Sequence, residues 1–138
     1  MVTSTRIHVQ TRGDCDILDI TGQVAKEVED SGVKDGTVTV FVAGSTAGLT
    51  TIEFERGVLG DFADMWDRTV PRDIRYKHDA AWGDGNGHSH VRSSILGPSL
   101  VVPFVNKRLT LGTWQQIVLV DFDNRPRSRD IVLQIMGE

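Results

Sequence analysis

Cysteine is nearly absent from this sequence. With one cysteine among 138 residues, no internal disulfide can form, and we therefore predict a cytoplasmic protein in a reducing compartment. No apolar run approaches the ~20 residues that a membrane-spanning helix needs, so no membrane is expected as a partner. The first ten residues, "MVTSTRIHVQ", alternate polar and apolar side chains, which is unlike a secretory signal peptide.

Strongly basic stretches are absent as well. The chain carries 15 Lys and Arg against 19 Asp and Glu, for a formal net charge of −4, and the two signs are interspersed. Nucleic-acid backbones bind to basic stripes, so a nucleic acid is not an expected partner. Linkers, low-complexity tracts and internal repeats are also missing, and residues 1–138 are predicted to form a single domain with its own core.

Hydrophobic periodicity predicts a mixture of strands and helices. Alternating or β-branched segments indicate seven or so strands, within residues 3–12, 15–20, 36–44, 48–55, 99–106, 108–112, 114–123 and 128–138. A helical period predicts three helices, at residues 21–32, 56–71 and 89–96. Hairpin turns are expected at Asn106-Lys107 and Asp123-Asn124. The fold class is therefore α+β, with a largely antiparallel sheet and helices on one face.

Residues 77–99 hold three of the four histidines. His78, His88 and His90 could supply three imidazole ligands and leave one position for water or substrate, as in an open zinc site. Because each helical step turns by ~100°, His88 and His90 can share a metal only if the backbone there is irregular, which the three nearby glycines allow. The alternative is a polar loop whose imidazoles bond to backbone groups.

The same stretch has the features of an anion site. A glycine-rich run that enters a helix presents free N–H groups and the positive end of the helix dipole. Asn86 and Gly87 lie at that point, and Arg92 adds charge one turn into the helix. We expect these residues, with the hydroxyl residues Ser45 and Thr46, to bind phosphate.

Other polar residues are candidates for catalysis. Glu53 follows an apolar run and could act as a general base, a metal ligand or the partner of a histidine, with a surface salt bridge as the alternative. Asp84 lies inside the histidine stretch. Gln115 and Gln116 point to opposite faces of a strand, so one of them, assigned as Gln116, can face a substrate. Cys15 has no nearby histidine, which disfavours a catalytic role.

The arginines of "RPRSR" lie on one side of an extended run. Such a row is typical of a solvated face. The alternatives are that Arg125, Arg127 and Arg129 pair with an acid of a neighbouring subunit or with a substrate phosphate.

Four motifs together resemble the YjbQ family of secondary thiamine-phosphate synthase-like proteins: "GSTAGLTTIE", "HDAAWGDGNGHSH", "ILGPSL" and "LGTWQQIVLVDFDNRPR". The resemblance runs from Arg6 to Glu138. It implies an α+β domain with a mixed, partly barrel-like sheet, assembled as a homotrimer with clefts near the subunit contacts. It also implies a weak thiamine-phosphate synthase activity, which joins a hydroxymethylpyrimidine diphosphate to a thiazole phosphate and releases diphosphate.

The resemblance also implies which residues form the site. The family's histidine motif matches at His78, His88 and His90, and its glutamate at Glu53. Many members have a histidine in place of Gly44 and an asparagine in place of Ile52.

The expected cofactor is a divalent metal that helps to stabilise the leaving diphosphate. Imidazoles favour zinc, whereas magnesium, the second choice, usually needs a pair of carboxylates. A metal-dependent hydrolase of a phosphate or amide and a non-enzymatic ligand-binding trimer are the alternative functions.

Overall fold

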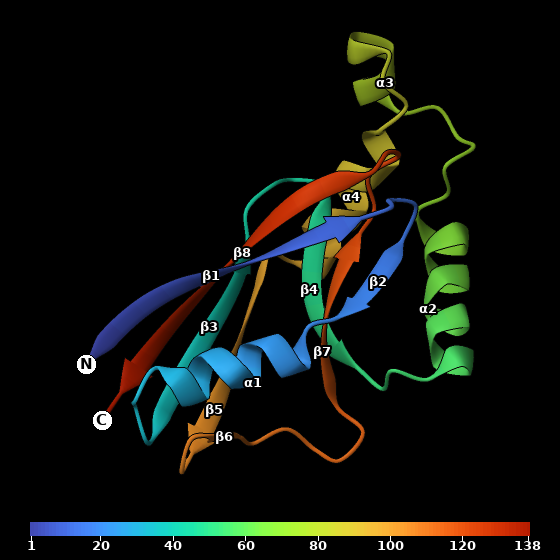
Figure 1. Ribbon diagram of the computed structural model, residues 1–138. Coiled ribbons are helices and arrows are strands. Elements are labelled where there is room, and N and C mark those ends of the chain that lie inside the picture. Colours follow the sequence, from blue (N-terminus) through green and yellow to red (C-terminus); the bar gives the residue numbers. More distant parts are fainter.

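The structure is a computed structural model that describes all 138 residues (Figure 1). The longest helix has 14 residues, and none is long and apolar enough to cross a bilayer. Eight strands and four helices follow one another along the chain: β1 (Val2–Thr11), β2 (Asp16–Asp19), α1 (Thr21–Asp30), β3 (Gly36–Val42), β4 (Ala47–Ile52), α2 (Arg56–Thr69), α3 (Lys77–Trp82), α4 (Gly87–Leu96), β5 (Ser99–Val105), β6 (Arg108–Leu109), β7 (Gln116–Asp121) and β8 (Arg127–Gly137).

All strand pairs are antiparallel, and they form two sheets. Five strands follow the spatial order β1-β8-β3-β5-β6, and three follow the order β2-β7-β4. Together the sheets curl into a half-barrel with α1 lying across its hollow (Figure 1). The predicted α+β class with a partly barrel-like antiparallel sheet is therefore confirmed, with four helices. The prediction that helices cover one face is wrong, because α1 and α2 pack on opposite faces of β7.

Strand β7 is buried on both of its faces. Ile117 and Leu119 belong to the main core, which also contains the inward residues of α1. Val118 and Val120 belong to a second cluster with Trp66 of α2. Successive strand residues point to opposite faces, so a strand covered on both sides has a continuous apolar run. This explains why "IVLV" lacks the alternation seen in β1.

The connections between strands differ in part from the predictions. The Asn106-Lys107 hairpin is confirmed, since both residues have the positive φ, 52° and 65°, that a two-residue turn of this type needs. The hairpin predicted at Asp123-Asn124 is wrong, because β7 and β8 belong to different sheets. Residues 122–126 instead carry the chain from the small sheet to the large one.

Helix α4 lies against β4 and positions the histidine stretch. The hydroxyl of Ser93 donates to the Ala47 carbonyl at 2.6 Å, and the Leu49 N–H donates to the Gly97 carbonyl at 3.0 Å. On the N-terminal side of these contacts lie the start of α4 and residues 43–46, which join β3 to β4. The histidine stretch and the predicted hydroxyl residues therefore lie at the same end of the molecule.

Candidate functional site

Glycines shape the backbone between α3 and α4. Gly83 and Gly85 have φ of 67° and 65°, a conformation that residues with side chains rarely adopt. Gly87, the first residue of α4, lies so close to Tyr76 that an added Cβ would be 2.6 Å from the Tyr76 Cβ. The alternating glycines thus allow the chain to turn sharply after α3 and to pack the start of α4 closely.

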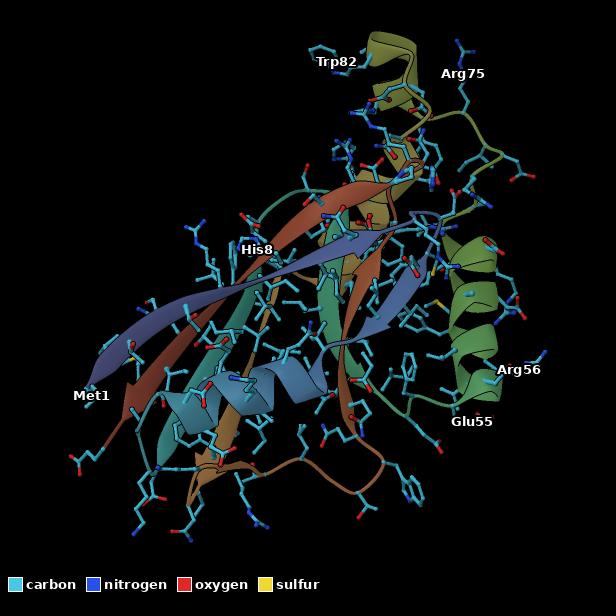
Figure 2. All side chains as sticks on the ribbon, in the orientation of Figure 1. Met1, His8, Glu55, Arg56, Arg75 and Trp82 are labelled. Carbon is cyan, nitrogen blue, oxygen red and sulfur yellow. The ribbon has the colours of Figure 1, made fainter.

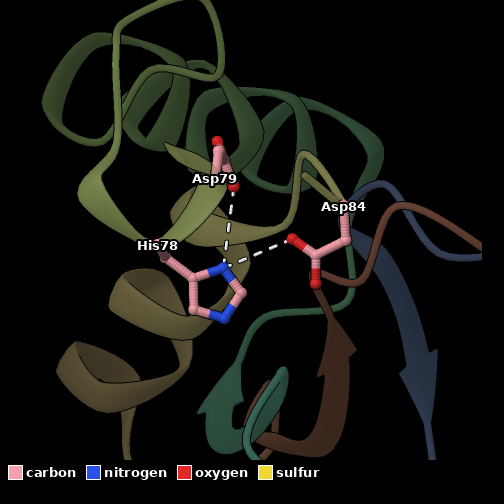
Figure 3. Close-up of side chains that lie close together, drawn as sticks. All are labelled: His78, Asp79 and Asp84. Atoms are coloured by element: carbon pink, nitrogen blue, oxygen red, sulfur yellow. Dashed lines mark ion pairs between the residues drawn. The ribbon is translucent and has the colours of Figure 1, made fainter. Parts of the chain in front are cut away.

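This turn brings one imidazole and two carboxylates together (Figure 3). His78, Asp79 and Asp84 each offer a ligand atom within 4.8 Å of the others. His78 Nδ1 lies 3.3 Å from Asp84 Oδ1 and 3.6 Å from Asp79 Oδ1, yet this buried nitrogen has no hydrogen-bond partner. Ligand atoms on a tetrahedral zinc ion with bonds of ~2.0–2.1 Å are about 3.3–3.4 Å apart. The spacing of His78, Asp79 and Asp84 therefore suits a shared cation better than direct hydrogen bonds. These three residues are the candidate cation site and are called the metal cluster below.

Backbone hydrogen bonds hold both carboxylates of the metal cluster. Asp79 Oδ1 accepts from the Gly87 N–H at 2.8 Å, and Asp84 Oδ1 accepts from the Asn86 N–H at 3.1 Å. The first N–H of α4 is thus already bound by a carboxylate of the chain. Asp79 was missing from the predicted site residues, and its only sequence signal is its position next to His78.

The structure brings two of the three predicted histidine ligands together. The rings of His78 and His90 have centroids 4.5 Å apart, at an interplanar angle of 41°. His88 is only 2% exposed, with its ring centroid 6.5 Å from that of Tyr76. Burial lowers the pKa of His88, and the charge of Arg92 lowers it further, so the neutral imidazole is favoured. His88 is therefore a buried, neutral side chain whose Nε2 lies 3.2 Å from the Ser89 hydroxyl oxygen.

Two of the residues predicted to bind phosphate, Arg92 and Asn86, form hydrogen bonds inside the protein. Arg92 is buried, with its Nε donating to the Val70 carbonyl at 3.0 Å and its Nη2 lying 3.3 Å from Asp67 Oδ1. The side-chain oxygen of Asn86, also buried, accepts from the Asn124 N–H at 3.2 Å. Both side chains are therefore fixed by contacts inside the protein.

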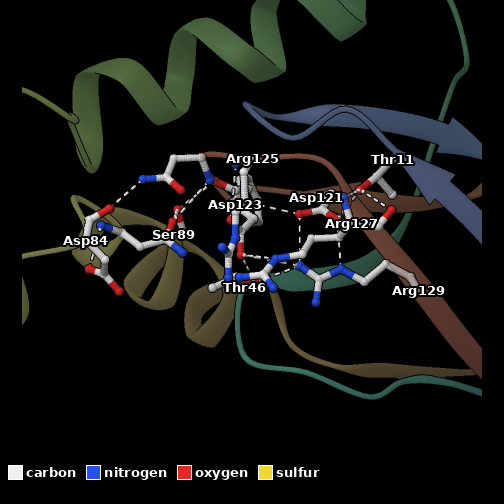
Figure 4. Close-up of polar contacts among 12 residues, drawn as sticks. Thr11, Thr46, Asp84, Ser89, Asp121, Asp123, Arg125, Arg127 and Arg129 are labelled. Atoms are coloured by element: carbon white, nitrogen blue, oxygen red, sulfur yellow. Dashed lines mark hydrogen bonds and ion pairs between the residues drawn. The ribbon is translucent and has the colours of Figure 1, made fainter. Parts of the chain in front are cut away.

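Thr46 belongs to a buried ionic network that joins the two sheets (Figure 4). Its hydroxyl donates to Asp123 Oδ2 at 2.9 Å and accepts from Arg129 Nη2 at 2.6 Å. Arg129 also donates to both oxygens of Asp121, at 2.8 and 3.0 Å, and Arg127 Nε donates to Asp123 at 2.9 Å. Both carboxylates are fully buried, so the two guanidinium groups neutralise two charges inside the fold.

Hydrogen bonding decides the protonation of Asp123. Burial alone raises the pKa of this carboxyl, but the hydrogen bonds from Thr46 and Arg127 outweigh burial and hold the pKa below its ordinary value. Asp123 is therefore ionised at neutral pH. Ser45, next to Thr46, is exposed and takes no part in the network.

Glu53 and Gln116 lie together, but away from the histidines. Both line a cavity of about 440 Å³, whose other lining residues are Asp19, Phe54, Glu55, Thr113 and Trp114. The six residues of β4 separate this cavity from the α4 end by about 20 Å, at ~3.3 Å per residue. Figure 2 shows Glu55 and Trp82 at opposite ends of the molecule. Glu53 and Gln116 therefore do not reach the metal cluster of this chain.

Cys15 is a structural residue. It has a positive φ of 63° and packs against the cluster that contains Trp66. Burial raises the pKa of its thiol to about 11, although the charge of Arg92 acts in the opposite direction. A thiol that remains protonated at neutral pH is a poor nucleophile, which agrees with the absence of a histidine beside it.

The fold is that of a single α+β domain with an antiparallel half-barrel sheet, and a histidine–carboxylate cluster lies where α3 meets α4. The chain belongs to the YjbQ family, since the model of this family, described as "UPF0047 protein YjbQ-like", matches residues 5–138.

Relatives and solved structures resemble the chain over its whole length. A UPF0047 protein of Archaeoglobus fulgidus is 38% identical over 130 residues, which are 94% of this chain and 98% of the relative. The crystal structure of a YbjQ-like protein of unknown function from Sulfolobus solfataricus superposes with a TM-score of 0.94 at 36% identity, covering 100% of this chain and 99% of the other. A hypothetical protein of Aeropyrum pernix superposes with a TM-score of 0.91 at 32% identity, with 99% of both chains covered.

Proposed function

We propose that this chain is a metal-assisted enzyme that acts on a small phosphorylated molecule, with thiamine-phosphate synthase-type activity. The observation that carries the proposal is the buried His78 Nδ1, which faces two carboxylate oxygens without a hydrogen bond. Imidazole suits zinc, and the carboxylates of Asp79 and Asp84 also meet the requirement of magnesium for oxygen ligands. The structure thus supplies the carboxylate pair that the sequence did not reveal.

The proposed reaction breaks one bond and forms another. The C–O bond between the pyrimidine methylene carbon and diphosphate breaks, and its electron pair leaves on the diphosphate oxygen. The lone pair of the thiazole nitrogen forms the new C–N bond. A divalent cation held by the metal cluster would supply positive charge for the leaving diphosphate. Asp79 and Asp84 are held in place by backbone N–H groups, so the ligand positions are set before substrate binds.

Asp84→Asn is expected to lower the rate of thiamine phosphate formation by at least about 100-fold, because it removes one ligand charge. A chelator should inhibit the unmodified protein, and added zinc or magnesium should restore its activity. Asp64→Asn is the matched control, since Asp64 is exposed on α2 away from the metal cluster. Product would be followed as thiamine phosphate after mixing the two substrates.

Equal activity in both variants would remove the metal cluster from the mechanism. Metal-dependent release of phosphate without the thiazole partner would show the alternative, a hydrolase. No product, together with no bound metal, would favour a non-enzymatic ligand-binding protein.

We further propose a homotrimer in which Glu53 and Gln116 of one subunit complete the site of the next. The separation of these residues from the metal cluster within one subunit supports it. So does the outer face of the five-stranded sheet, which no helix covers and which exposes Phe41, Val101 and Met136.

Coexpression of Glu53→Gln with Asp84→Asn tests this arrangement. Each variant alone should be inactive, whereas random mixed trimers with sites shared between subunits should regain about a quarter of the unmodified activity. Sedimentation would measure the assembly in parallel. No recovery in mixed trimers, or a monomer in solution, would contradict the shared site.

A further inference from the structure

One nitrogen of the Arg129 guanidinium, Nη1, donates no hydrogen bond within the protein. The Nε and Nη2 of Arg129 donate to Asp121 and Thr46, but Nη1 has no acceptor within the protein. The side chain is 8% exposed and held on two sides, so the direction of Nη1 is fixed by the network. Nη1 itself is not cut off from solvent, so this edge of a largely buried guanidinium is open to a ligand.

The position of Gly44 shows the direction in which Arg129 Nη1 points. Gly44 has φ of 125°, and a Cβ added there would lie 2.7 Å from Arg129 Nη1. Any larger residue would therefore cover or displace the group. Because Gly44 has no side chain and both Gly44 and Ser45 are exposed, Nη1 faces the surface beside this connection.

The backbone at the same place has further free donors. The N–H groups of Gly44, Ser45 and Thr46 donate to no acceptor within the protein, and neither does the hydroxyl of Ser45. Immediately before them, the Ala43 N–H is paired with the Asp130 carbonyl, so the free groups begin where strand pairing ends. Runs of unpaired N–H groups bind anions in many proteins.

We propose that residues 44–46 and Arg129 Nη1 bind a tetrahedral oxyanion, the phosphate group of a small ligand. The proposal rests on the proposed function for its biological meaning. It deepens that function by placing the substrate phosphate at this oxyanion site, and not at the start of α4, where Asp79 binds the Gly87 N–H. The oxyanion site lies next to that start, since Ser89 donates to the Phe122 carbonyl and the Phe122 N–H donates to the Thr46 carbonyl.

The buried ionic network of Asp121, Asp123 and Arg129 holds the donors of the oxyanion site in place before an anion binds. Asp121 and Asp123 hold the guanidinium and the Thr46 hydroxyl on the inner side, so neither has to reorganise when an anion binds. Arg127, which is partly exposed, pairs with Asp123 and balances the charge of this carboxylate, so that it repels an incoming anion less. A donor set fixed in advance lowers the entropy cost of binding, and a charged N–H donor strengthens the contact.

Inorganic phosphate is the probe for the test. Nitrogen-15 NMR spectra would be recorded during titration at constant ionic strength, with a chelator present. Saturable shifts are expected for the amides of residues 44–46 and for the Arg129 guanidinium, with a Kd of about 1 mM. Ser45→Asp should weaken binding at least about tenfold, because its carboxylate repels the anion and competes for the same donors. Ser4→Asp, the same change at an exposed position of β1, should bind as the unmodified protein does.

Three results would overturn the oxyanion site: shifts that do not saturate, shifts confined to α4, or unchanged binding in Ser45→Asp. The titration needs no metal, so its outcome is separate from that of the activity assay. Saturable phosphate binding without metal-dependent activity would remove the proposed function alone. Metal-dependent activity without phosphate binding at residues 44–46 would remove the oxyanion site alone.

Discussion

Arg129→Met is expected to lower the free energy of unfolding by about 3–5 kcal/mol. Methionine keeps much of the side-chain length but removes two N–H groups that donate to Asp121 at 2.8 and 3.0 Å. Asp121 is fully buried, so its charge would be left without its main partner. The hydroxyl of Thr11, at 2.7 Å, cannot replace a cation. Urea unfolding at neutral pH measures the difference.

Arg6→Met is the matched control for this prediction. Arg6 is 63% exposed and lies 3.8 Å from Asp130, and exposed pairs of this kind contribute about 0–1 kcal/mol. Circular dichroism before unfolding would show whether both variants keep the native sheet. A small and equal loss in the two variants would mean that the buried network can be replaced by apolar contacts, as happens with some buried ion pairs.

The arginines of "RPRSR" show that the burial of a charged residue cannot be predicted from the local sequence pattern alone. In an extended run the spacing of these arginines is typical of a solvated face, yet Arg129 is buried. The cause lies elsewhere in the chain, because Asp121, the last residue of β7 in the other sheet, faces Arg129 and pairs with it. Charge pairing between sheets is a tertiary property, and no periodicity within one segment can predict it.

The fold was more predictable than the site, because most elements bury one or two regular faces. The strand predicted at residues 3–12 is β1, and the helix predicted at 56–71 is α2, each within a few residues. Helix α3 was missed because its six residues include no buried side chain, so it has no apolar stripe. The Asp123-Asn124 hairpin was wrong because sequence neighbours need not pair when two sheets share a domain.

The candidate site was predicted in part. Spacing placed His78 and Asp84 in one polar segment, and the structure brings them together. The role of Asp79 depends on the chain turning back after Gly83, which composition suggests but does not specify. The burial of His88 depends on how α4 packs against Tyr76, a contact made only in the folded protein.

His78→Gln and His88→Gln should separate metal binding from stability. His78→Gln is expected to lower metal affinity by at least about 100-fold, because it removes the one imidazole of the metal cluster, while stability changes by less than about 1 kcal/mol. His88→Gln is expected to lower stability by about 1–3 kcal/mol, because a flexible polar chain replaces a buried ring, and to leave metal affinity nearly unchanged. Calorimetric zinc titration and urea unfolding measure the two quantities.

An equal loss of metal affinity in the two variants would support the three-histidine site predicted from the sequence. If His88→Gln lost metal as severely as His78→Gln, the buried imidazole would have to turn toward the cluster when the ion binds, at the cost of leaving its packed position beside Tyr76. His8→Gln is the control for both variants, since His8 is exposed on β1 and pairs with Asp130 far from α3. The metal affinity of His8→Gln should equal that of the unmodified protein, because one exposed imidazole with a single carboxylate beside it holds a cation only weakly.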